Sequence, residues 1–424
     1  MQIRSIDPDR QRIGQILLGN PDFRLGRPSE QIEFTWDQPI DPKSGLKVKR
    51  YLYINNPTGG VRWFFPADNP HPSHLALYNS ASLTAKAYKL TTYLAYFFRQ
   101  AKMLCSGYFE VGIPESEVLG LEEILSQVGF DSYAVFTGTV GENRKTIVAL
   151  NQGSRTTHFV KIAHSLKSIQ LIRREEESLR DLADWNFSAM HAPSVAGATD
   201  QALILTNVRP DHGREQARIG EVHVRALREM YQAFGYVDQL SQLPFWSEIH
   251  TRIQHLKVCR VHDPAIELVQ IRRIVSMLTE VFDSIPAEQH IRVSMTHGDF
   301  TPWNMYIDDK GIYVYDWELS KASRPLLYDM FHFSYQSGVM LLRQKWPQIR
   351  RELLRDLRLP TTRMMVEQFQ LDIHLLHGLY LLDNITYYLN IYLQEPKVHQ
   401  QVYWLLDVWE SSLEAYLRQD TLKP

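Results

Sequence analysis

The chain of 424 residues has only two cysteines, Cys105 and Cys259. Two cysteines cannot build the disulfide framework of a small secreted protein, so the sequence favours a reducing, cytoplasmic location. Neither sign of charge is in excess, because 46 Lys and Arg stand against 48 Asp and Glu and the formal net charge is −2. A nucleic-acid-binding protein usually carries a basic surplus, and we therefore expect no nucleic-acid partner.

Long hydrophobic runs are also missing. Residues 90–98 are apolar and aromatic, but Lys89, Arg99 and Lys102 bound them too closely for a transmembrane span. We expect this stretch to form a buried helix. Residues 1–7 lack the apolar core of a signal peptide, and we expect no insertion into a membrane.

The second half of the chain contains a polar motif between short β-prone runs. Residues 296–304 read Thr-His-Gly-Asp-Phe-Thr-Pro-Trp-Asn, and Asp-Trp-Glu follows at 316–318. The runs 305–307 and 312–315 flank a turn at 308–311. This pattern predicts a β-hairpin that begins just after the first motif and ends just before the second.

Such a hairpin brings Asp299, Asn304 and Asp316 together at one end. Phosphoryl transfer needs this set of side chains. One carboxylate orients and deprotonates the attacking hydroxyl, while an Asn and a second carboxylate hold Mg²⁺ on the nucleotide phosphates. The alternative is a hairpin whose acidic residues only cap turns, but several spaced positions would then have to coincide by chance.

The two motifs resemble the catalytic loop and metal motif of the aminoglycoside phosphotransferase and choline kinase family, which has a protein-kinase-like fold. The resemblance implies ATP- and Mg²⁺-dependent transfer of phosphate to a hydroxyl. It assigns Asp299 as the catalytic carboxylate, and Asn304 and Asp316 as metal ligands. It also implies supporting roles for His297 within the loop and for Asp329, which would hold the loop through backbone amides.

A nucleotide-binding lobe should then lie upstream of the catalytic loop. The β-prone runs 133–137 and 145–150 enclose Gly138 and Gly141, and glycines let a backbone approach phosphates closely, although such a hairpin is more often a plain turn. The next strand carries Lys161 among apolar residues, where an ammonium needs an anionic partner. The alternative for Lys161 is an outward position at a sheet edge.

Glu175 lies in a helix expected at 168–184 and resembles the family's glutamate that pairs with the strand lysine. Because Glu176 and Glu177 follow it, the choice depends on helical phase, which places Glu175 on the apolar stripe and the other two towards solvent. The alternative is a solvated run of charge. A strand at 202–206 leads to Asn207, which matches the family's adenine-binding hinge.

The resemblance implies an α+β, two-lobed protein-kinase-like fold with an additional N-terminal region. We divide the chain into residues 1–125, whose role the sequence does not assign, a nucleotide-binding N-lobe at 126–210 and a helical C-lobe at 211–424. A helix is expected at about 82–104 in the first region. Apolar spacing predicts further helices in the C-lobe at 222–240, 265–282, 326–342, 362–393 and 400–417.

The phosphate acceptor is the least defined part of this interpretation. Only twelve residues lie between Asp316 and Asp329, which leaves no room for the activation segment of a protein kinase. A small molecule is therefore favoured: a sugar, an aminoglycoside or an amino alcohol. In the helix at 362–393, Tyr380, Asp383 and Tyr387 share one face, and Asp383 is a candidate partner for an amine. The alternative is aromatic core packing.

Two other functions stay open at this point. The runner-up is a catalytically weak nucleotide-binding or scaffolding protein that keeps the fold, and the third choice is a protein kinase. The complete set of Asp299, Asn304 and Asp316 argues against the runner-up. The sequence does not determine the oligomeric state.

Overall fold

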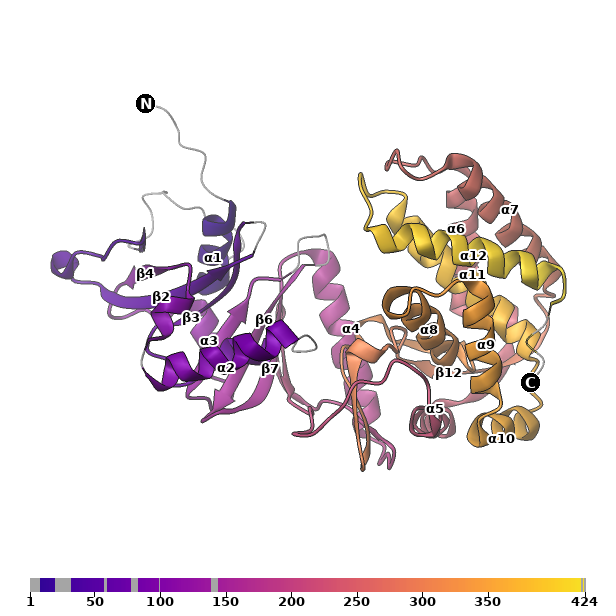
Figure 1. Ribbon diagram of the computed structural model, residues 1–424, viewed down its shortest axis with the longest axis horizontal. Helices are drawn as coiled ribbons and strands as arrows, with labels where there is room; N and C mark the ends of the chain where they lie inside the picture. The colour runs from indigo at the N-terminus through magenta and orange to yellow at the C-terminus, as the bar shows by residue number, and fades with distance from the viewer. Residues whose placement is uncertain are drawn as a thin grey trace. The chain divides into compact units, whose positions relative to one another are not determined.

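The computed structural model describes residues 8–19, 32–56, 59–77, 83–98, 100–138, 144–420 and 422. The chain divides into two compact units. The first consists of Met1–Arg180 with Pro193–Asn207, and the second of Asp181–Ala192 with Val208–Pro424. Strands dominate the first unit and helices the second (Figure 1), which confirms the predicted α+β fold class.

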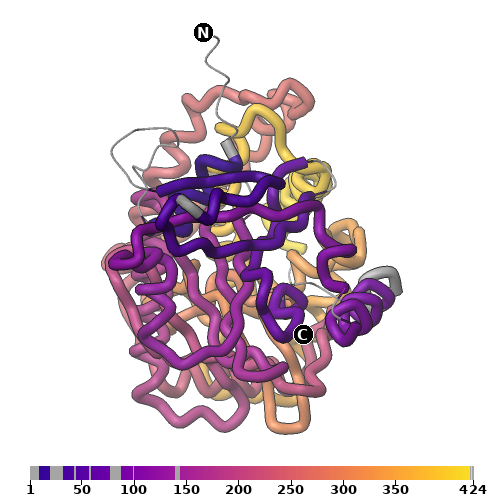
Figure 2. Tube along the Cα trace, turned by 90° about the vertical axis from the view of Figure 1, so that its left-hand side faces the viewer, coloured from indigo at the N-terminus to yellow at the C-terminus, as the bar shows by residue number. Residues whose placement is uncertain are grey.

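One antiparallel sheet of nine strands organises the first unit, in the order β1-β4-β2-β3-β5-β6-β7-β10-β9. The indigo to magenta part of the Cα trace in Figure 2 contains this sheet. The strands are β1 (Glu33–Trp36), β2 (Lys47–Asn55), β3 (Val61–Pro66), β4 (Gly107–Ile113), β5 (Ser132–Phe136), β6 (Lys145–Gln152), β7 (Arg155–Ala163), β9 (Val195–Ala198) and β10 (Ala202–Thr206). The helices are α1 (Pro8–Leu18), α2 (Leu83–Phe97), α3 (Gly120–Leu125) and α4 (Leu166–Ala183), with short 3₁₀ helices at Pro42–Ser44, Ser73–Leu77 and Ala101–Leu104.

Both faces of this sheet are apolar near its centre. Because side chains alternate along a strand, Tyr51 and Phe64 belong to one buried cluster while their neighbours Leu52 and Phe65 belong to another. The first cluster also contains side chains of α1 and α3. Strand β3 pairs with β5, so the expected N-terminal region and the expected nucleotide lobe share one sheet.

Helix α2 corrects the expectation that residues 90–98 are buried. Leu90, Leu94 and Phe97 are 62%, 48% and 80% exposed. Apolar side chains surround this part of the helix on every side, so periodicity could not indicate the buried face; Tyr96 is among the side chains that pack on the sheet. Among the described residues, no helix combines the length and the apolar character needed to span a membrane.

The second unit contains two small sheets and most of the helices. Strands β11 (Tyr236–Gln239), β12 (His290–Thr296) and β15 (Lys321–Pro325) form one sheet, and β8 (Met190–His191), β13 (Met305–Asp308) and β14 (Gly311–Val314) form the other. Strands β13 and β14 are the hairpin expected from the sequence. The helices are α5 (Glu221–Phe234), α6 (Pro244–Val258), α7 (Leu268–Ser284), α8 (Tyr328–Gln336), α9 (Trp346–Leu357), α10 (Pro360–Phe369), α11 (Ile373–Tyr392) and α12 (Gln400–Leu417). Short helical turns lie at Leu240–Gln242, Pro302–Asn304 (η5), Trp317–Leu319 (η6) and Ser337–Leu341.

Two of the helices expected in the C-lobe were too long, and so was the one expected at 82–104, since α2 ends at Phe97. The helix predicted at 222–240 ends at Phe234, because the chain turns at Gly235 into strand β11. The helix predicted at 362–393 is two helices, α10 and α11. Gln370 breaks it with a left-handed backbone (φ +50°), and the Asp372 carboxylate then caps α11 by accepting from Leu375 N at 3.0 Å.

Helix α11 is buried along most of its length. It packs against α6, α8 and α12, all in the second unit (Figure 1). A helix that is apolar on every side is typical of a core position, since no face needs to meet water. The few polar side chains on α11 are therefore placed inside the helical unit, where they must find protein partners.

Candidate active site

The loop between β12 and η5 carries the predicted catalytic residues. The buried Asp329 carboxylate, at the start of α8, accepts hydrogen bonds from His297 N at 2.7 Å and Gly298 N at 2.9 Å. Gly298 has φ +81°, and a Cβ atom there would collide with the carbonyl oxygen of Leu319. Only glycine fits this position, and the backbone conformation of the loop beside Asp329 is therefore fixed.

The His297 side chain connects the loop to the end of the hairpin. Its Nδ1 accepts from Asp299 N at 3.2 Å, which leaves Nε2 to donate to the Tyr315 carbonyl at 3.2 Å. The ring also meets Trp317 edge to face, with centroids 4.7 Å apart. His297 thus ties the segments around Asp299 and Asp316 together.

Asn304 lies against the predicted catalytic carboxylate. Its Nδ2 donates to Asp299 Oδ2 at 2.8 Å and to the Asp299 carbonyl at 3.1 Å. Because the amide nitrogen faces Asp299, the amide oxygen is the atom of Asn304 that is left to ligate a cation. The Asp299 side chain keeps 24% of its surface exposed, so the carboxylate can be reached from solvent.

Asp316 follows β14 in a left-handed backbone conformation, with φ +73° and ψ +58°. A non-glycine residue in this region is strained and persists where its neighbours are fixed. The neighbours are fixed here, since Tyr315 N donates to Asn304 O at 3.0 Å and the Trp317 indole donates to Val314 O at 3.1 Å.

Sequence reasoning missed one residue at this site, His332. Its Nε2 lies 3.2 Å from Asp299 Oδ1. The available signal was the spacing of three residues between Asp329 and His332, which places both on one face of α8. The spacing alone did not single out His332, because an isolated histidine among aromatic residues of a helix usually belongs to the core.

In the first unit, the structure brings Lys161 and Glu175 together. The ammonium of Lys161 lies 2.6 Å and 2.8 Å from the two carboxylate oxygens of Glu175. The Glu175 side chain is fully buried, whereas the Lys161 side chain is 11% exposed. Strand β7 lies between β6 and β10, so Lys161 is not at a sheet edge.

The neighbouring glutamates have other environments. Glu177 is exposed as expected, but the Glu176 side chain is only 14% exposed because it pairs with Arg173 and Arg180, each at 2.8 Å, which corrects its expected position towards solvent. Burial acts to raise the pKa of Glu176, but hydrogen bonds from the two arginines lower it on balance.

The helical phase of α4 is set by reciprocal hydrogen bonds at its start. Ser165 Oγ accepts from Ser168 N at 3.1 Å, and Ser168 Oγ accepts from Ser165 N at 2.9 Å.

Three further nucleotide-lobe predictions concern Gly138, Gly141 and Asn207. Gly138 has φ +84°, and a Cβ there would meet the Lys145 carbonyl, so a glycine is required for the turn itself. Gly141 lies outside the described residues. Asn207, the last residue of the first unit, donates from its backbone N to Thr157 O at 2.7 Å. Nucleotide binding by these residues stays a prediction.

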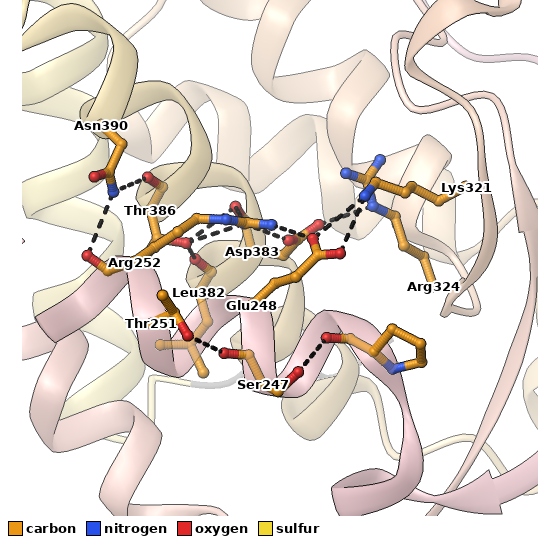
Figure 3. A network of polar contacts seen from close by, with 11 residues as sticks. Ser247, Glu248, Thr251, Arg252, Lys321, Arg324, Leu382, Asp383, Thr386 and Asn390 are labelled. Atoms are coloured by element: carbon orange, nitrogen blue, oxygen red, sulfur yellow. Dashed lines mark hydrogen bonds and ion pairs between the residues drawn. The ribbon is translucent and has the colours of Figure 1, made fainter. Parts of the chain in front are cut away.

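The proposed acceptor residues on α11 are mostly structural. The Asp383 carboxylate is fully buried and forms ion pairs of 2.8 Å with both Arg252 and Arg324, as Figure 3 shows. Burial alone would raise the pKa of Asp383, whereas the two arginines lower it on balance. With both oxygens paired, Asp383 has no surface to meet a substrate amine, which corrects that expectation. Tyr380 is likewise fully buried, while Tyr387 lies partly exposed beside Arg252.

Two later tyrosines of α11 lie within electrostatic range of the Asp299 carboxylate. Tyr388 and Tyr392 are partly buried and stack with ring centroids 5.8 Å apart. Burial, and then the negative charge of Asp299, raise the pKa of Tyr388 and bring the pKa of Tyr392 to about 12. Both phenols therefore keep their protons at neutral pH and can donate hydrogen bonds.

Comparison with known proteins gave one family. The model of a family described as "Phosphotransferase enzyme family" matches residues 121–359, more than half of the chain. No curated protein matched the chain.

Solved structures with related folds include three kinases. An ADP-bound aminoglycoside phosphotransferase, APH(2'')-Ib, is 13% identical and covers 70% of this chain and 97% of its own, with a TM-score of 0.42. An ethanolamine kinase of Plasmodium vivax is 12% identical and covers 83% and 99%, with a TM-score of 0.43. A glucosamine kinase in complex with glucosamine, ADP and inorganic phosphate is 13% identical and covers 68% and 82%, with a TM-score of 0.45.

The contact between Lys161 and Glu175 predicts that Glu175 and its neighbour Glu177 differ in their effect on ATP binding. We expect Glu175→Gln to weaken ATP binding roughly tenfold, which corresponds to about 1.4 kcal/mol of lost lysine positioning. Exposed Glu177→Gln serves as the control and should bind ATP like the wild type. Isothermal titration calorimetry measures both affinities, and equal affinities for the two variants would show that Glu175 does not position Lys161.

The buried charges around Asp383 predict a large loss of stability. Asp383→Asn should lower the free energy of unfolding of the helical unit by about 3–5 kcal/mol, because the buried Arg324 guanidinium loses its ion-pair partner, whereas Arg252 keeps Glu248 at 2.6 Å. Since the pKa of Asp383 is lowered in the folded protein, its contribution is present above the usual Asp pKa and is lost as pH falls. Urea unfolding at neutral pH measures the change.

The control for this stability experiment is the exposed pair of Glu414 and Arg418. Glu414→Gln should change the free energy of unfolding by no more than about 0.5 kcal/mol. A similar small change for Asp383→Asn would mean that the three-residue charge cluster is not the main connection between α6, β15 and α11.

Proposed function

The chain belongs to the phosphotransferase enzyme family, and we propose that it transfers the γ-phosphate of ATP to a hydroxyl of a small molecule with Mg²⁺ as cofactor. The observation that carries the proposal is the arrangement at the catalytic loop. A solvent-accessible carboxylate, Asp299, is oriented by the side-chain amide of Asn304. The Asp329 carboxylate fixes the same loop by accepting a hydrogen bond from its backbone. Family membership with its protein-kinase-like fold supports the same chemistry.

Asp299 is the residue that would act on the acceptor. It would orient the acceptor hydroxyl and take its proton as the hydroxyl oxygen bonds to the γ-phosphorus. The bond from that phosphorus to the bridging oxygen breaks, and ADP leaves with the bonding electrons. Much of the rate in such a reaction comes from positioning, so a carboxylate with a fixed orientation is what the step requires.

Asn304 and Asp316 are the proposed magnesium ligands. Both offer hard oxygen atoms, and the amide of Asn304 turns its nitrogen to Asp299, which supports its oxygen as a ligand. When bound, Mg²⁺ would neutralise phosphate charge and polarise the transferred group. Lys161, fixed by Glu175 yet still partly exposed, would hold the phosphates of the nucleotide.

A small acceptor is favoured by the path of the chain after the metal motif. From Asp316 the chain passes through η6 and β15 directly into α8, and β15 pairs with β12. This segment has no extended loop of the kind that presents a protein substrate in protein kinases. We propose a sugar, an aminoglycoside or an amino alcohol, with Tyr388 and Tyr392 in place of Tyr380 and Asp383 among the candidate contacts. The cytoplasm stays the proposed location.

A screen of these acceptor classes with ATP and Mg²⁺ tests the function, and Asp299→Asn tests the mechanism. The variant should keep nucleotide binding but lose about 10²–10⁴-fold in turnover, because an amide cannot accept the hydroxyl proton. Asp309→Asn, at the exposed tip of the same hairpin, is the matched control and should stay active. Normal turnover of Asp299→Asn would remove Asp299 from the mechanism. A wild-type protein that transfers no phosphate at all would favour the scaffolding alternative.

The metal assignment predicts a difference between its two ligands. Asp316→Ala should weaken Mg²⁺-dependent ATP binding more than Asn304→Ala, because it deletes a full negative charge beside the cation. Calorimetric titrations of ATP with Mg²⁺ and with a chelator measure the dependence. If ATP binding to Asp316→Ala gained as much from Mg²⁺ as binding to the wild type does, Asp316 would not be a ligand.

A further inference from the structure

We propose that His332 is a positioning residue for the catalytic carboxylate, acting as a neutral imidazole whose Nε2–H donates to Asp299 and whose Nδ1 accepts from Asn384. This inference rests on the proposed function in one respect, that Asp299 is the group that receives the acceptor's proton. Beyond that function, the proposal states that two helices, α8 through His332 and α11 through Asn384, help to orient the Asp299 carboxylate.

Both ring nitrogens of His332 have partners. Nε2 lies 3.2 Å from Asp299 Oδ1, and Nδ1 lies 3.1 Å from the side-chain nitrogen of Asn384. The ring is fully buried and nearly parallel to those of Tyr328 and Tyr388, at interplanar angles of 10° and 13°. Neighbours on these sides restrict rotation of the imidazole, so its two nitrogens keep their directions.

The partners determine where the proton lies. An ionised carboxylate only accepts hydrogen bonds, so Nε2 must carry hydrogen to contact Asp299 favourably. A neutral imidazole then has Nδ1 as its acceptor, and Nδ1 must meet a donor. The Asn384 amide nitrogen is such a donor.

The result is a carboxylate held through both oxygens. Asn304 donates to Oδ2 at 2.8 Å, and His332 is placed to donate to Oδ1 at 3.2 Å. Rotation of the Asp299 carboxylate about its last bond would break both contacts. Each oxygen has a second lone pair, so the two donors still leave acceptor sites for a substrate hydroxyl. His332 itself is fully buried and acts only through Asp299.

Helix α8 thus fixes the catalytic loop at two levels. Asp329 holds the backbone at His297 and Gly298, and His332, one turn later, holds the side chain of the next residue, Asp299. Any buried histidine needs hydrogen-bond partners at its ring nitrogens, so paired nitrogens alone do not indicate a function. What points to a positioning role is the identity of one partner, the solvent-accessible carboxylate of Asp299.

The first test reads the tautomer and needs no activity. In the full-length protein labelled with ¹⁵N-histidine, the signal that disappears in His332→Gln identifies His332 among the 16 histidines. At mildly alkaline pH we expect a neutral ring with the proton on Nε2, and Asn384→Leu should shift the Nδ1 signal, because that nitrogen loses its donor while the proton stays on Nε2 beside Asp299. A proton on Nδ1, a doubly protonated ring, or a signal unchanged by Asn384→Leu would overturn the proposal.

The second test compares two replacements of opposite character. His332→Phe keeps an aromatic ring but removes the donor, and should lower kcat roughly 10- to 100-fold with the KM for ATP nearly unchanged. His332→Gln loses the ring but offers an amide N–H towards Asp299, and should recover most of kcat. Simple packing predicts the reverse order. His399→Gln, at an exposed histidine, is the control, and thermal unfolding verifies that each variant folds.

The two tests separate failure of this inference from failure of the proposed function. If the wild type transfers phosphate but His332→Phe is as active as His332→Gln or more active, the positioning role is wrong and the function stands. If the wild type transfers phosphate to no acceptor, the function is wrong, and the tautomer measurement still decides whether His332 donates to Asp299 and accepts from Asn384.

Discussion

The buried carboxylate of Asp329 is the interaction on which the candidate site depends. A carboxylate that is only 3% exposed is costly unless donors surround it, and a loop that passes through the left-handed Gly298 has backbone amides without partners of their own. The carboxylate accepts hydrogen bonds from the backbone amides of His297 at 2.7 Å and Gly298 at 2.9 Å, so both the buried charge and the loop amides have partners. Because Asp299 is the next residue, its position follows from this pairing before any side-chain contact forms.

The same requirement, that a buried charge must have a partner, separates structural from functional charges elsewhere in the chain. Asp383 and Arg324 are both buried, at 1% and 5% side-chain exposure, and neutralise each other inside the helical unit. Lys161 is also paired, but its side chain keeps 11% of its surface exposed. A paired charge with residual exposure can still meet a ligand, whereas a paired charge without it can only hold the fold. This difference favours Lys161 over Asp383 as a ligand-binding residue.

The sequence predicted the parts of the site that depend on short-range spacing. Asn304 and Asp316 flank the β13–β14 hairpin, Asp299 lies in the loop just before it, and the choice of Glu175 needed only the phase of one helix. The acceptor residues could not be predicted in this way. Asp383 meets Arg252, which is 131 residues away in the chain, and α11 is apolar on nearly every side, so no pattern indicated which of its polar groups were buried. The prediction for α2 was wrong for the same reason: its apolar side chains did not indicate a buried face, and several expected to be buried are exposed.

His332 lies between these two cases. Its spacing from Asp329 is local and visible in the sequence, but its meaning depends on Asn384, which is 52 residues away. Since Asn384 neighbours Asp383, the cluster of Arg252, Arg324 and Asp383 fixes the same stretch of α11 that orients the imidazole. A disturbance of that cluster should therefore reach Asp299 through Asn384 and His332. Asp383 and Asn384 are consecutive residues of α11, so one turn of this helix carries both the structural ion pairs and the contact to His332.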